Sequence, residues 1–186
     1  MKNKKIRCIC EGAVFIAAAL ALSYLKITIG FSLGGFGGSI DLVMIPLILF
    51  AVRWGLEWGL GAGLIYGTLK FFFAGGVAVN WQSMLLDYSL AYMMVGLAGV
   101  MKNREWGLVI GGFIGCFGRF IIHFISGVTI YAQYMPEEFL DMTMTSPTIY
   151  SLLYNGTYMI PNTIIVLIIG AALTIPLKKY ITASDL

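Results

Sequence analysis

The stretch Trp106–Ile130, WGLVIGGFIGCFGRFIIHFISGVTI, decides the class of fold. Arg119 and His123 are its only side chains that can carry a charge near neutral pH, and nearly all the others are aliphatic, aromatic or glycine. The core of a bilayer needs roughly 20 apolar residues in an α-helix. A strand of a membrane barrel would instead alternate apolar and polar residues over about ten positions. The stretch is therefore predicted to be a transmembrane helix.

The composition of the whole chain agrees with this interpretation. Of its 186 residues, 59% are hydrophobic and 11% are charged, whereas soluble domains are about 25% charged. A soluble globular domain and a disordered chain are thereby excluded, and no clustered basic face indicates nucleic-acid binding. The sequence contains no P-loop, no H-E-x-x-H and no G-x-S-x-G motif. Three cysteines without C-x-x-C spacing predict neither a metal site nor a disulfide framework.

Five further apolar stretches flank the one quoted above, at about residues 12–29, 40–53, 57–73, 83–101 and 149–177. We therefore predict one all-α integral membrane domain over residues 1–186 with six transmembrane helices. A basic tail (1–10), a glycine-rich outer loop (30–39) and an acidic outer loop (131–147) complete it. A signal peptide is the alternative for the first stretch, but that stretch is long and the sequence after it is equally apolar.

The distribution of charge predicts the orientation of the chain. When the sides of the membrane alternate along the predicted helices, one side holds Lys2, Lys4, Lys5, Arg7, Arg53, Lys102, Arg104, Lys178 and Lys179. The loops on the other side hold no lysine or arginine, but they do hold Glu137, Glu138 and Asp141. By the positive-inside rule, both termini are predicted to be cytoplasmic. Lys26 and Lys70 lie near outer helix ends, where they are predicted to snorkel.

Small residues recur every four positions in two of the predicted helices. Gly55, Gly59, Gly63 and Gly67 form one stripe, and Ala13, Ala17 and Ala21 form the other. Such stripes let helix backbones approach closely in lipid. The glycine stripe is predicted to pack internally. The alanine stripe starts beside the basic tail, and two interpretations stay open for it: internal packing, or contact with a helix of a partner protein.

Ionisable residues inside a membrane are functional candidates by default. They are Asp41, Asp87, Arg119 and His123 here, and Arg119 shares a helix face with His123 because four residues separate them. Asp87 could form an ion pair with Arg119 or Lys70, or it could be the counter-ion of a bound cation. His123 could tie two helices together, or it could contact a ligand. Arg119 lies in mid-span and needs a partner.

Tyrosines gather near the outer ends of the last three predicted helices. They are Tyr88, Tyr131, Tyr134, Tyr150, Tyr154 and Tyr158, with Asn155 and Asn162 among them. An interfacial aromatic belt explains part of this pattern. Aromatic faces also attract cations, and the amide of asparagine offers both donors and acceptors. Together with Asp87 and His123, the pattern favours a flat, cationic ligand that forms hydrogen bonds.

Four segments, in this order and spacing, resemble the thiamine-specific S-components (ThiT) of energy-coupling-factor transporters. They are GGSIDLVMIP at 37–46 with RWG at 53–55, LLDY at 85–88, RFIIHFISGV at 119–128 and YSLLYNG at 150–156. The resemblance implies an S-component-like fold in the cytoplasmic membrane of a prokaryote, with both termini inside and a thiamine site near the outer surface. It implies a membrane T-component and two cytoplasmic ATPases as partners, with no enzymatic activity, cofactor or metal in this chain.

The resemblance also implies roles for individual residues. Asp87, which is Glu in some members, would be the counter-ion of the thiazolium ring, and Tyr88 would form a wall of the pocket. His123, Tyr150 and Asn155 would contact the aminopyrimidine or hydroxyethyl ends, and Gly127 would leave room for the ligand. The remaining pocket positions stand where some members carry Trp, and they are Phe36, Tyr66 and Tyr131. Ala13, Ala17 and Ala21 match the surface that docks the T-component.

Other functions stay open at this point. One is an S-component for another vitamin, such as riboflavin, or for a thiamine precursor. Another is a stand-alone secondary transporter in which Asp87 carries a coupling proton. A third is a membrane enzyme or assembly factor that uses Asp87, Arg119 and His123 as a polar relay. Replacing Asp87 by Asn distinguishes a neutral vitamin from thiamine as the ligand. The change should strongly weaken binding of a cationic ligand but not of a neutral one.

Overall fold

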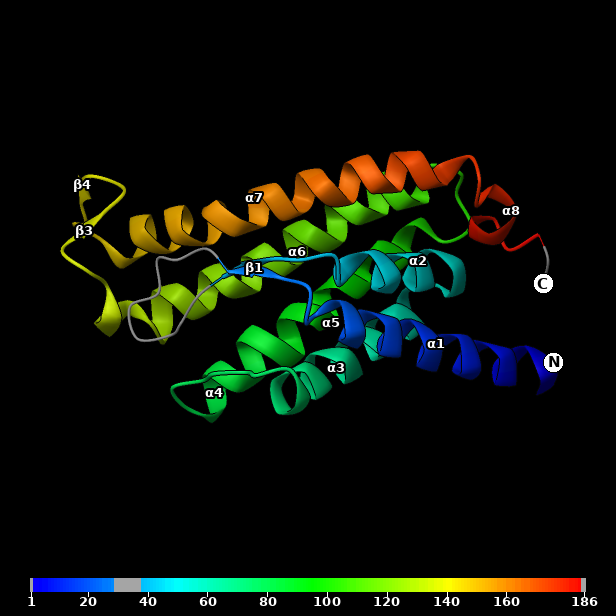
Figure 1. Cartoon of the computed structure of the whole chain (residues 1–186), viewed down its shortest axis with the longest axis horizontal. Helices are drawn as coiled ribbons and strands as arrows, with labels where there is room; N and C mark the ends of the chain where they lie inside the picture. The colour runs from blue at the N-terminus through cyan, green and yellow to red at the C-terminus, as the bar shows by residue number, and fades with distance from the viewer. Residues whose placement is uncertain (1, 29–37, 185–186) are drawn as a thin grey trace.

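The structure, a computed structural model, describes residues 2–28 and 38–184, and it is an elongated bundle of helices (Figure 1). The longer helices are α1 (Lys2–Leu22), α2 (Met44–Trp54), α3 (Leu56–Phe73), α6 (Gly107–Thr129) and α7 (Pro147–Thr174). Between α3 and α6, the chain forms α4 (Trp81–Met84), the π-helix η1 (Leu85–Leu90), α5 (Ala91–Val95) and the 3₁₀-helix η2 (Gly96–Met101). The chain closes with α8 (Lys178–Ile181), and a 3₁₀ turn, η3 (Ala132–Tyr134), follows α6.

Short strands connect some of these helices. Strand β1 (Ile27–Thr28) pairs antiparallel with β2 (Ser39–Ile40), and β3 (Glu138–Phe139) pairs antiparallel with β4 (Met142–Thr143). The start of α1 and helix α8 lie at one end of the bundle, called the terminal end here (Figure 1). The β3–β4 pair and α4 lie at the opposite end, called the hairpin end.

The helical class predicted from the sequence is confirmed, and each predicted apolar stretch overlaps a helical segment. The first stretch, predicted over about 12–29, is helical only as far as Leu22 and continues into a turn and strand β1, so the prediction of a helix over its second half is wrong. Within the described residues, three helical segments are long and apolar enough to cross a membrane: Trp81–Met101, Gly107–Thr129 and Pro147–Thr174. Helix α1 begins at Lys2, so most of the predicted basic tail is helical. The short helix α2 tolerates Pro46 because proline in a first turn removes no internal hydrogen bond.

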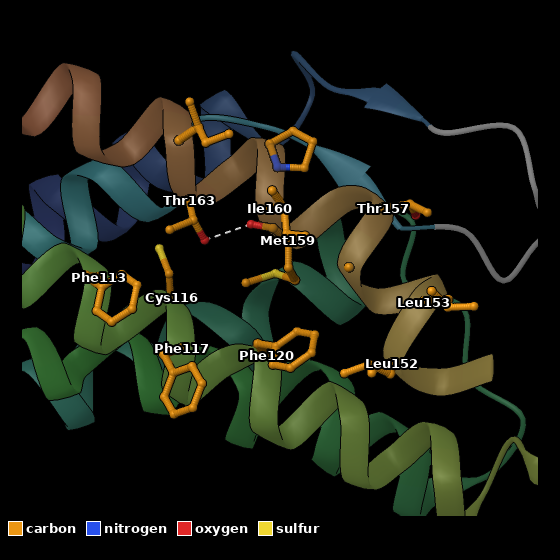
Figure 2. Close-up of a pocket in the computed structure, with 13 residues that line it drawn as sticks. Phe113, Cys116, Phe117, Phe120, Leu152, Leu153, Thr157, Met159, Ile160 and Thr163 are labelled. Atoms are coloured by element: carbon orange, nitrogen blue, oxygen red, sulfur yellow. Dashed lines mark hydrogen bonds between the residues drawn. The ribbon is translucent and has the colours of Figure 1, made fainter. Parts of the chain in front are cut away.

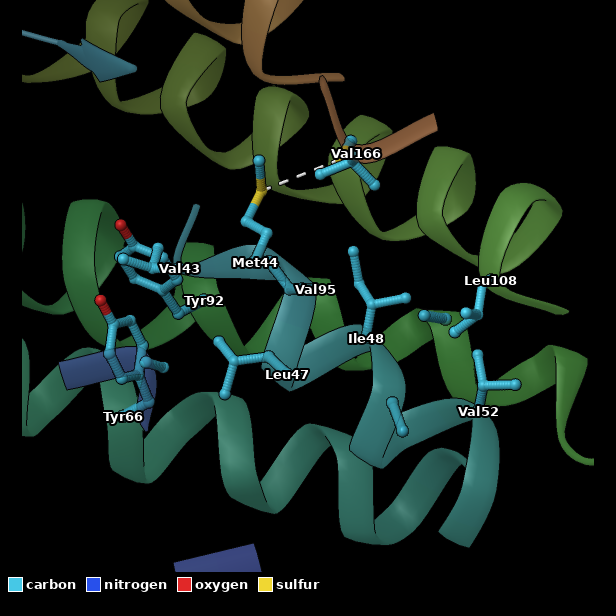
Figure 3. Close-up of a cluster of buried hydrophobic side chains, with 14 of the residues drawn as sticks. Val43, Met44, Leu47, Ile48, Val52, Tyr66, Tyr92, Val95, Leu108 and Val166 are labelled. Atoms are coloured by element: carbon cyan, nitrogen blue, oxygen red, sulfur yellow. Dashed lines mark hydrogen bonds between the residues drawn. The ribbon is translucent and has the colours of Figure 1, made fainter. Parts of the chain in front are cut away.

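The core surrounds α2, which other helices cover (Figure 3). Met44, Leu47, Ile48 and Val52 of this helix are almost completely buried. Their apolar partners come from the neighbouring helices and include Tyr66, Tyr92, Val95, Leu108 and Val166. A helix that is apolar on all sides is expected at such a central position.

The glycine stripe of α3 packs internally, as predicted. A Cβ atom on Gly63 would lie 2.1 Å from the carbonyl oxygen of Tyr92, and one on Gly67 would lie 2.2 Å from that of Tyr88. A Cβ on Gly59 would lie 2.8 Å from the carbonyl oxygen of Gly96. These contacts leave no room for a side chain. Glycine therefore lets α3 approach the backbone of η1, α5 and η2, and this packing sets the position of Asp87 in η1.

Candidate functional site

Asp87 lies in the π-helix η1, which interrupts the helical segment 81–101. Single π-turns inside helices are frequent at functional sites. The carboxylate faces α6, where its Oδ1 lies 3.1 Å from Nδ1 of His123 and its Oδ2 accepts a hydrogen bond of 3.0 Å from Oγ of Ser126. The Asp87 side chain is 17% exposed. The Asp87 carboxylate is thus held mostly buried at the contact with α6, by the His123 imidazole and the Ser126 hydroxyl.

Arg119 lies one turn before His123 on α6. Its Nε donates a hydrogen bond of 3.2 Å to Nε2 of His123, and its guanidinium lies 4.3 Å from the ring centroid of Tyr92. Both Arg119 and His123 are buried. The partner that the sequence left open is therefore His123 together with the Tyr92 ring. We refer to Asp87, Arg119, His123 and Ser126 as the Asp87 cluster.

Lys70 is buried, so the prediction that it snorkels is wrong. Its Nζ lies 3.3 Å from Oδ2 of Asp41 and donates a hydrogen bond to the hydroxyl of Tyr92. Asp41 also accepts hydrogen bonds from Ser39 Oγ and the backbone N–H of Val43. The Lys70 amine points into the bundle because Asp41 and Tyr92 form an ion pair and a hydrogen bond with it there. Lys70 thus pairs with Asp41 and leaves Asp87 to His123 and Ser126.

An aromatic ladder on α7 leads from the hairpin end to His123. Tyr150, Tyr154 and Tyr158 follow one another at four-residue spacing, with ring centroids 5.6 and 6.0 Å apart. Phe139 of β3 packs against the Tyr150 ring at 5.4 Å. The Tyr158 ring meets His123 edge-on at 5.9 Å. The ladder places aromatic faces beside the Asp87 cluster.

The chain that follows the predicted glycine-rich loop is anchored on this ladder. The backbone N–H of Gly38 donates a hydrogen bond of 3.1 Å to the hydroxyl of Tyr154. A Cβ on Gly38 would overlap the Tyr158 ring at 1.9 Å, so only glycine fits there. Residues 29–37 lie outside the described residues. The predicted role of Phe36 and most of the predicted outer loop 30–39 therefore stay predictions.

Two predicted ligand contacts have partners within the protein. The Nδ2 of Asn155 donates to the carbonyl oxygen of Ser151 at 2.8 Å and to that of His123 at 3.3 Å, and its Oδ1 accepts from Tyr158. Asn155 thus ties α7 to α6. A Cβ on Gly127 would lie 2.2 Å from Oγ of Ser151. Ser151 of α7 lies where a side chain at position 127 would stand, so the two helices approach closely at Gly127, and its predicted ligand role stays a prediction.

The other predicted tyrosines lie at different depths. The hydroxyl of Tyr88 exchanges hydrogen bonds with the backbone of Val77, so it is held in the connection between α3 and α4. Tyr66 is completely buried, and its ring meets that of Tyr92 edge-on at 4.7 Å. Tyr131 follows α6 directly. Burial, and to a smaller degree the nearby Asp87 carboxylate, raise the pKa of the Tyr131 phenol. Tyr131 is thus the predicted tyrosine that adjoins Asp87.

Sequence analysis missed Ser126 and Ser151 as site residues. Ser126 lies three residues after His123, so helical periodicity places it on the same face and would have identified it. Ser151 had no comparable signal, because its role depends on the contact between α6 and α7.

A cavity of about 760 Å³ lies between α6 and α7 (Figure 2), and no residue of the Asp87 cluster lines it. Its walls are aromatic and aliphatic side chains, among them Phe113, Phe117, Phe120, Leu152 and Ile160, and none of its lining residues is charged. Burying a charge without a partner is costly. The cavity is therefore unsuited to a cation, and the Asp87 cluster is the better candidate.

The fold and the Asp87 cluster define a helical membrane protein with a polar, aromatic-walled site candidate beside its hairpin end. A family model described as "Thiamine transporter protein (Thia_YuaJ)" matches residues 9–182. The chain therefore belongs to the Thia_YuaJ thiamine transporter family, which confirms the resemblance seen in the sequence.

Individual relatives agree with this assignment. The chain is 32% identical to the thiamine transporter ThiT of Bacillus subtilis (strain 168), in an alignment that covers 90% of each protein. It is 28% identical to the thiamine transporter ThiT of Lacticaseibacillus paracasei, in an alignment that covers 97% of this chain and 93% of the relative. The solved structure of ThiT from Listeria monocytogenes has the same fold, with a TM-score of 0.81 at 24% identity, covering 96% of this chain and 99% of that one.

Proposed function

We propose that this protein captures thiamine at the outer face of the cytoplasmic membrane. It would act as the substrate-binding subunit, or S-component, of an ATP-driven energy-coupling-factor importer. The observation that carries the proposal is the Asp87 carboxylate, whose contacts include the His123 imidazole and the Ser126 hydroxyl. The proposal includes six transmembrane helices with both termini in the cytoplasm, so that the hairpin end faces outward.

The chemistry of the Asp87 cluster suits an organic cation. The carboxylate touches no lysine or arginine side chain in the described part of the chain, so its negative charge is left for a ligand. The aromatic ladder adds ring faces, and a cation over such a face gains about 0.5–2 kcal/mol. Thiamine carries a permanent positive charge and two aromatic rings. The names of the relatives, which are thiamine transporters, support the same ligand.

The capture experiment is calorimetric titration of the purified chain with thiamine and with riboflavin. None of the chain's four tryptophans, Trp54, Trp58, Trp81 and Trp106, belongs to the Asp87 cluster or the aromatic ladder, so fluorescence has no reporter there. We expect one thiamine per chain and no riboflavin. Losing a partly buried charge pair costs about 2–4 kcal/mol, so Asp87→Asn should weaken thiamine binding about 30- to 700-fold.

The matched control for this variant is Asp141→Asn. Asp141 is an exposed residue of the β3–β4 turn, so this change removes one negative charge from the same end of the bundle. Thiamine affinity should stay unchanged. Equal affinities of Asp87→Asn and the unmodified chain would contradict the counter-ion role, and saturable binding of riboflavin would point to the alternative vitamin.

The partner-docking role concerns Ala13, Ala17 and Ala21, which are exposed on α1, whereas Ala19 of the same helix is buried. An exposed stripe of small residues lets another helix approach closely. We propose that the T-component docks there and that two cytoplasmic ATPases energise release inward. Ala17→Trp should abolish copurification with the co-expressed T-component and ATPases while thiamine binding is kept.

Ile168→Trp is the control for that variant, because Ile168 is 63% exposed on α7. It should copurify with the partners like the unmodified chain. Copurification of Ala17→Trp at the normal level would contradict docking at the alanine stripe. Uptake of thiamine by the purified chain alone in vesicles, driven by a pH gradient, would contradict the S-component role and support a secondary transporter.

A further inference from the structure

The Arg119–His123 contact defines where the proton of the imidazole lies. A guanidinium has only N–H donors and no acceptor, and it stays protonated in proteins. Because Nε of Arg119 donates to Nε2 of His123 at 3.2 Å, that ring nitrogen must accept and carries no proton. The remaining nitrogen, Nδ1, then carries the proton of a neutral imidazole. It donates that proton to Oδ1 of Asp87 at 3.1 Å.

This direction matters because an imidazole beside a carboxylate ordinarily gains a proton. An opposite charge within a few ångströms favours the charged form of both groups. A protonated His123 would form an ion pair with Asp87 and cancel the negative charge that a cationic ligand needs. Arg119 opposes this in two ways. It occupies Nε2, where the second proton would have to bind, and its positive charge disfavours another cation next to it.

Arg119 is otherwise poorly suited as a structural tie. It is 4% exposed, yet its Nη1 has no hydrogen-bond partner within the described residues. Leaving a buried donor unsatisfied destabilises a fold, and a charged donor does so more than a neutral one. Its hydrogen bond to another side chain is the one to His123. The other charged groups on this side of the cluster, Lys70 and Asp41, pair with each other.

We propose that Arg119 is a positioning residue that keeps His123 uncharged, with its proton on Nδ1, and so reserves the negative charge of Asp87 for the ligand. The consequence for the ligand rests on the proposed function. The protonation state of His123 does not, because the geometry defines it in the protein without ligand.

His123 is the only histidine of the chain, which allows a direct test. The full chain is labelled with ¹⁵N-histidine, purified through a tag that lacks histidine and reconstituted in lipid at pH 7. The ¹⁵N spectrum then reports one imidazole without any assignment step. We expect the spectrum of a neutral imidazole, in which Nδ1 carries the proton and Nε2 carries none. An imidazolium, or a proton on Nε2, in the unmodified chain would overturn the proposal without the need for any variant.

Two variants separate the hydrogen bond from the charge. Arg119→Met removes both, so His123 should become an imidazolium or move its proton to Nε2, and thiamine affinity should fall about 10- to 100-fold. Arg119→Gln keeps an N–H donor for Nε2, so the proton should stay on Nδ1 and affinity should recover in part. Arg104→Met, which removes an exposed arginine near the terminal end, is the control and should change neither readout.

The outcomes also separate this inference from the proposed function. If His123 in Arg119→Met keeps the spectrum of the unmodified chain, Arg119 does not set its protonation state and the inference is wrong. If the expected spectra are obtained but the unmodified chain binds no thiamine, the role of Arg119 toward His123 stands and the proposed ligand is wrong.

Discussion

Two carboxylates near arginines, Glu11 at the terminal end and Asp87 on the other side of the core, are used in different ways. The Glu11 carboxylate accepts hydrogen bonds from Arg7 Nε and Arg53 Nε, both at 2.8 Å. It also accepts from Trp54 Nε1 at 2.9 Å and from the Tyr180 hydroxyl at 2.8 Å. Asp87 instead accepts hydrogen bonds from the His123 imidazole and the Ser126 hydroxyl. Arg119 contacts His123, which lies between Arg119 and Asp87.

The difference lies in whether the arginine touches the carboxylate directly, as Arg53 touches Glu11, or through another side chain, as Arg119 reaches Asp87 through His123. Arg53 is completely buried, touches Glu11 directly and also donates to the carbonyl oxygen of Tyr180 at 2.7 Å. Its charge and that of Glu11 cancel in a contact that joins α1, α2 and the α8 segment. At the Asp87 cluster His123 stands between the cation and the anion. The first arrangement stabilises the fold, and the second leaves a carboxylate for a ligand.

The largest effect that would test this comparison comes from Glu11→Ala. The variant removes the Glu11 carboxylate from the buried Arg53 guanidinium, and breaking a buried ion pair by removing one partner costs about 3–5 kcal/mol of folding free energy. Thermal unfolding can be followed with a thiol-reactive dye in a Cys10→Ser background, because Cys8 and Cys116 are buried and Cys10 is exposed. The folded fraction should still bind thiamine normally.

Glu57→Ala is the control for this variant, since Glu57 is exposed in the first turn of α3. Its unfolding temperature should stay close to that of the unmodified chain. If the two glutamate variants unfolded at the same temperature, the terminal-end contact would have no special structural role and the comparison would fail.

The second effect tests the packing that holds the Asp87 segment in place. Gly67→Ala would force a Cβ to 2.2 Å from the carbonyl oxygen of Tyr88, and overpacking of this kind costs about 1–3 kcal/mol. Because η1 must shift, thiamine affinity should fall as well. Gly61→Ala is the matched control on the same helix, since nothing lies within 4 Å of its added Cβ. Gly61→Ala should make the folded protein slightly more stable. If both variants lost the same stability and thiamine affinity, the packing argument would be refuted.

A smaller effect on stability is expected from Asp87→Asn. The asparagine keeps an acceptor for His123 or Ser126, so the loss is about that of one hydrogen bond, about 1 kcal/mol. The same dye assay measures it, in parallel with the thiamine titration. A variant that loses thiamine binding but barely changes its unfolding temperature sharpens the contrast with Glu11. Destabilisation as large as that of Glu11→Ala would mean that Asp87 is a structural residue.

The smallest effect is expected from the exposed ion pair between Lys178 and Glu105 at the terminal end, whose Nζ and Oε1 lie 2.6 Å apart. These side chains are 58% and 54% exposed, so Glu105→Gln should cost only about 0.2–1 kcal/mol. The effect should disappear at high salt in the dye assay. A loss comparable to that of Glu11→Ala would show that burial does not explain the strength of the Glu11 contact.

Much of the helical structure could be predicted because it depends on local sequence. The predicted range 57–73 compares with α3 at Leu56–Phe73, and 106–130 compares with α6 at Gly107–Thr129. A mainly apolar run of that length favours a helix in lipid, because a helix satisfies its backbone hydrogen bonds within the segment. The glycine stripe and the shared face of Arg119 and His123 follow from helical periodicity in the same way.

The candidate site was predictable only in part. Asp87 and His123 were selected as intramembrane ionisable groups, and the structure brings them together at 3.1 Å. Tyr88, the neighbour of Asp87 in sequence, is bound to Val77 instead. The π-turn at η1 adds a residue to the helical turn and changes which side chains share a face, and nothing in the sequence pattern marks it.

The sequence by itself determined that this is a helical membrane protein of the thiamine transporter family, and which ionisable groups lie among its apolar helices. Only the tertiary structure decided how groups on different helices and loops pair: Lys70 with Asp41, and Asp87 with His123 and Ser126. The physical reason is the range of the interactions. Hydrophobic length and helical period act within one segment, whereas the choice of a charge partner on another helix or loop depends on how those segments pack in three dimensions. The glycines of α3 contribute to that packing by letting α3 approach the backbone of η1 closely.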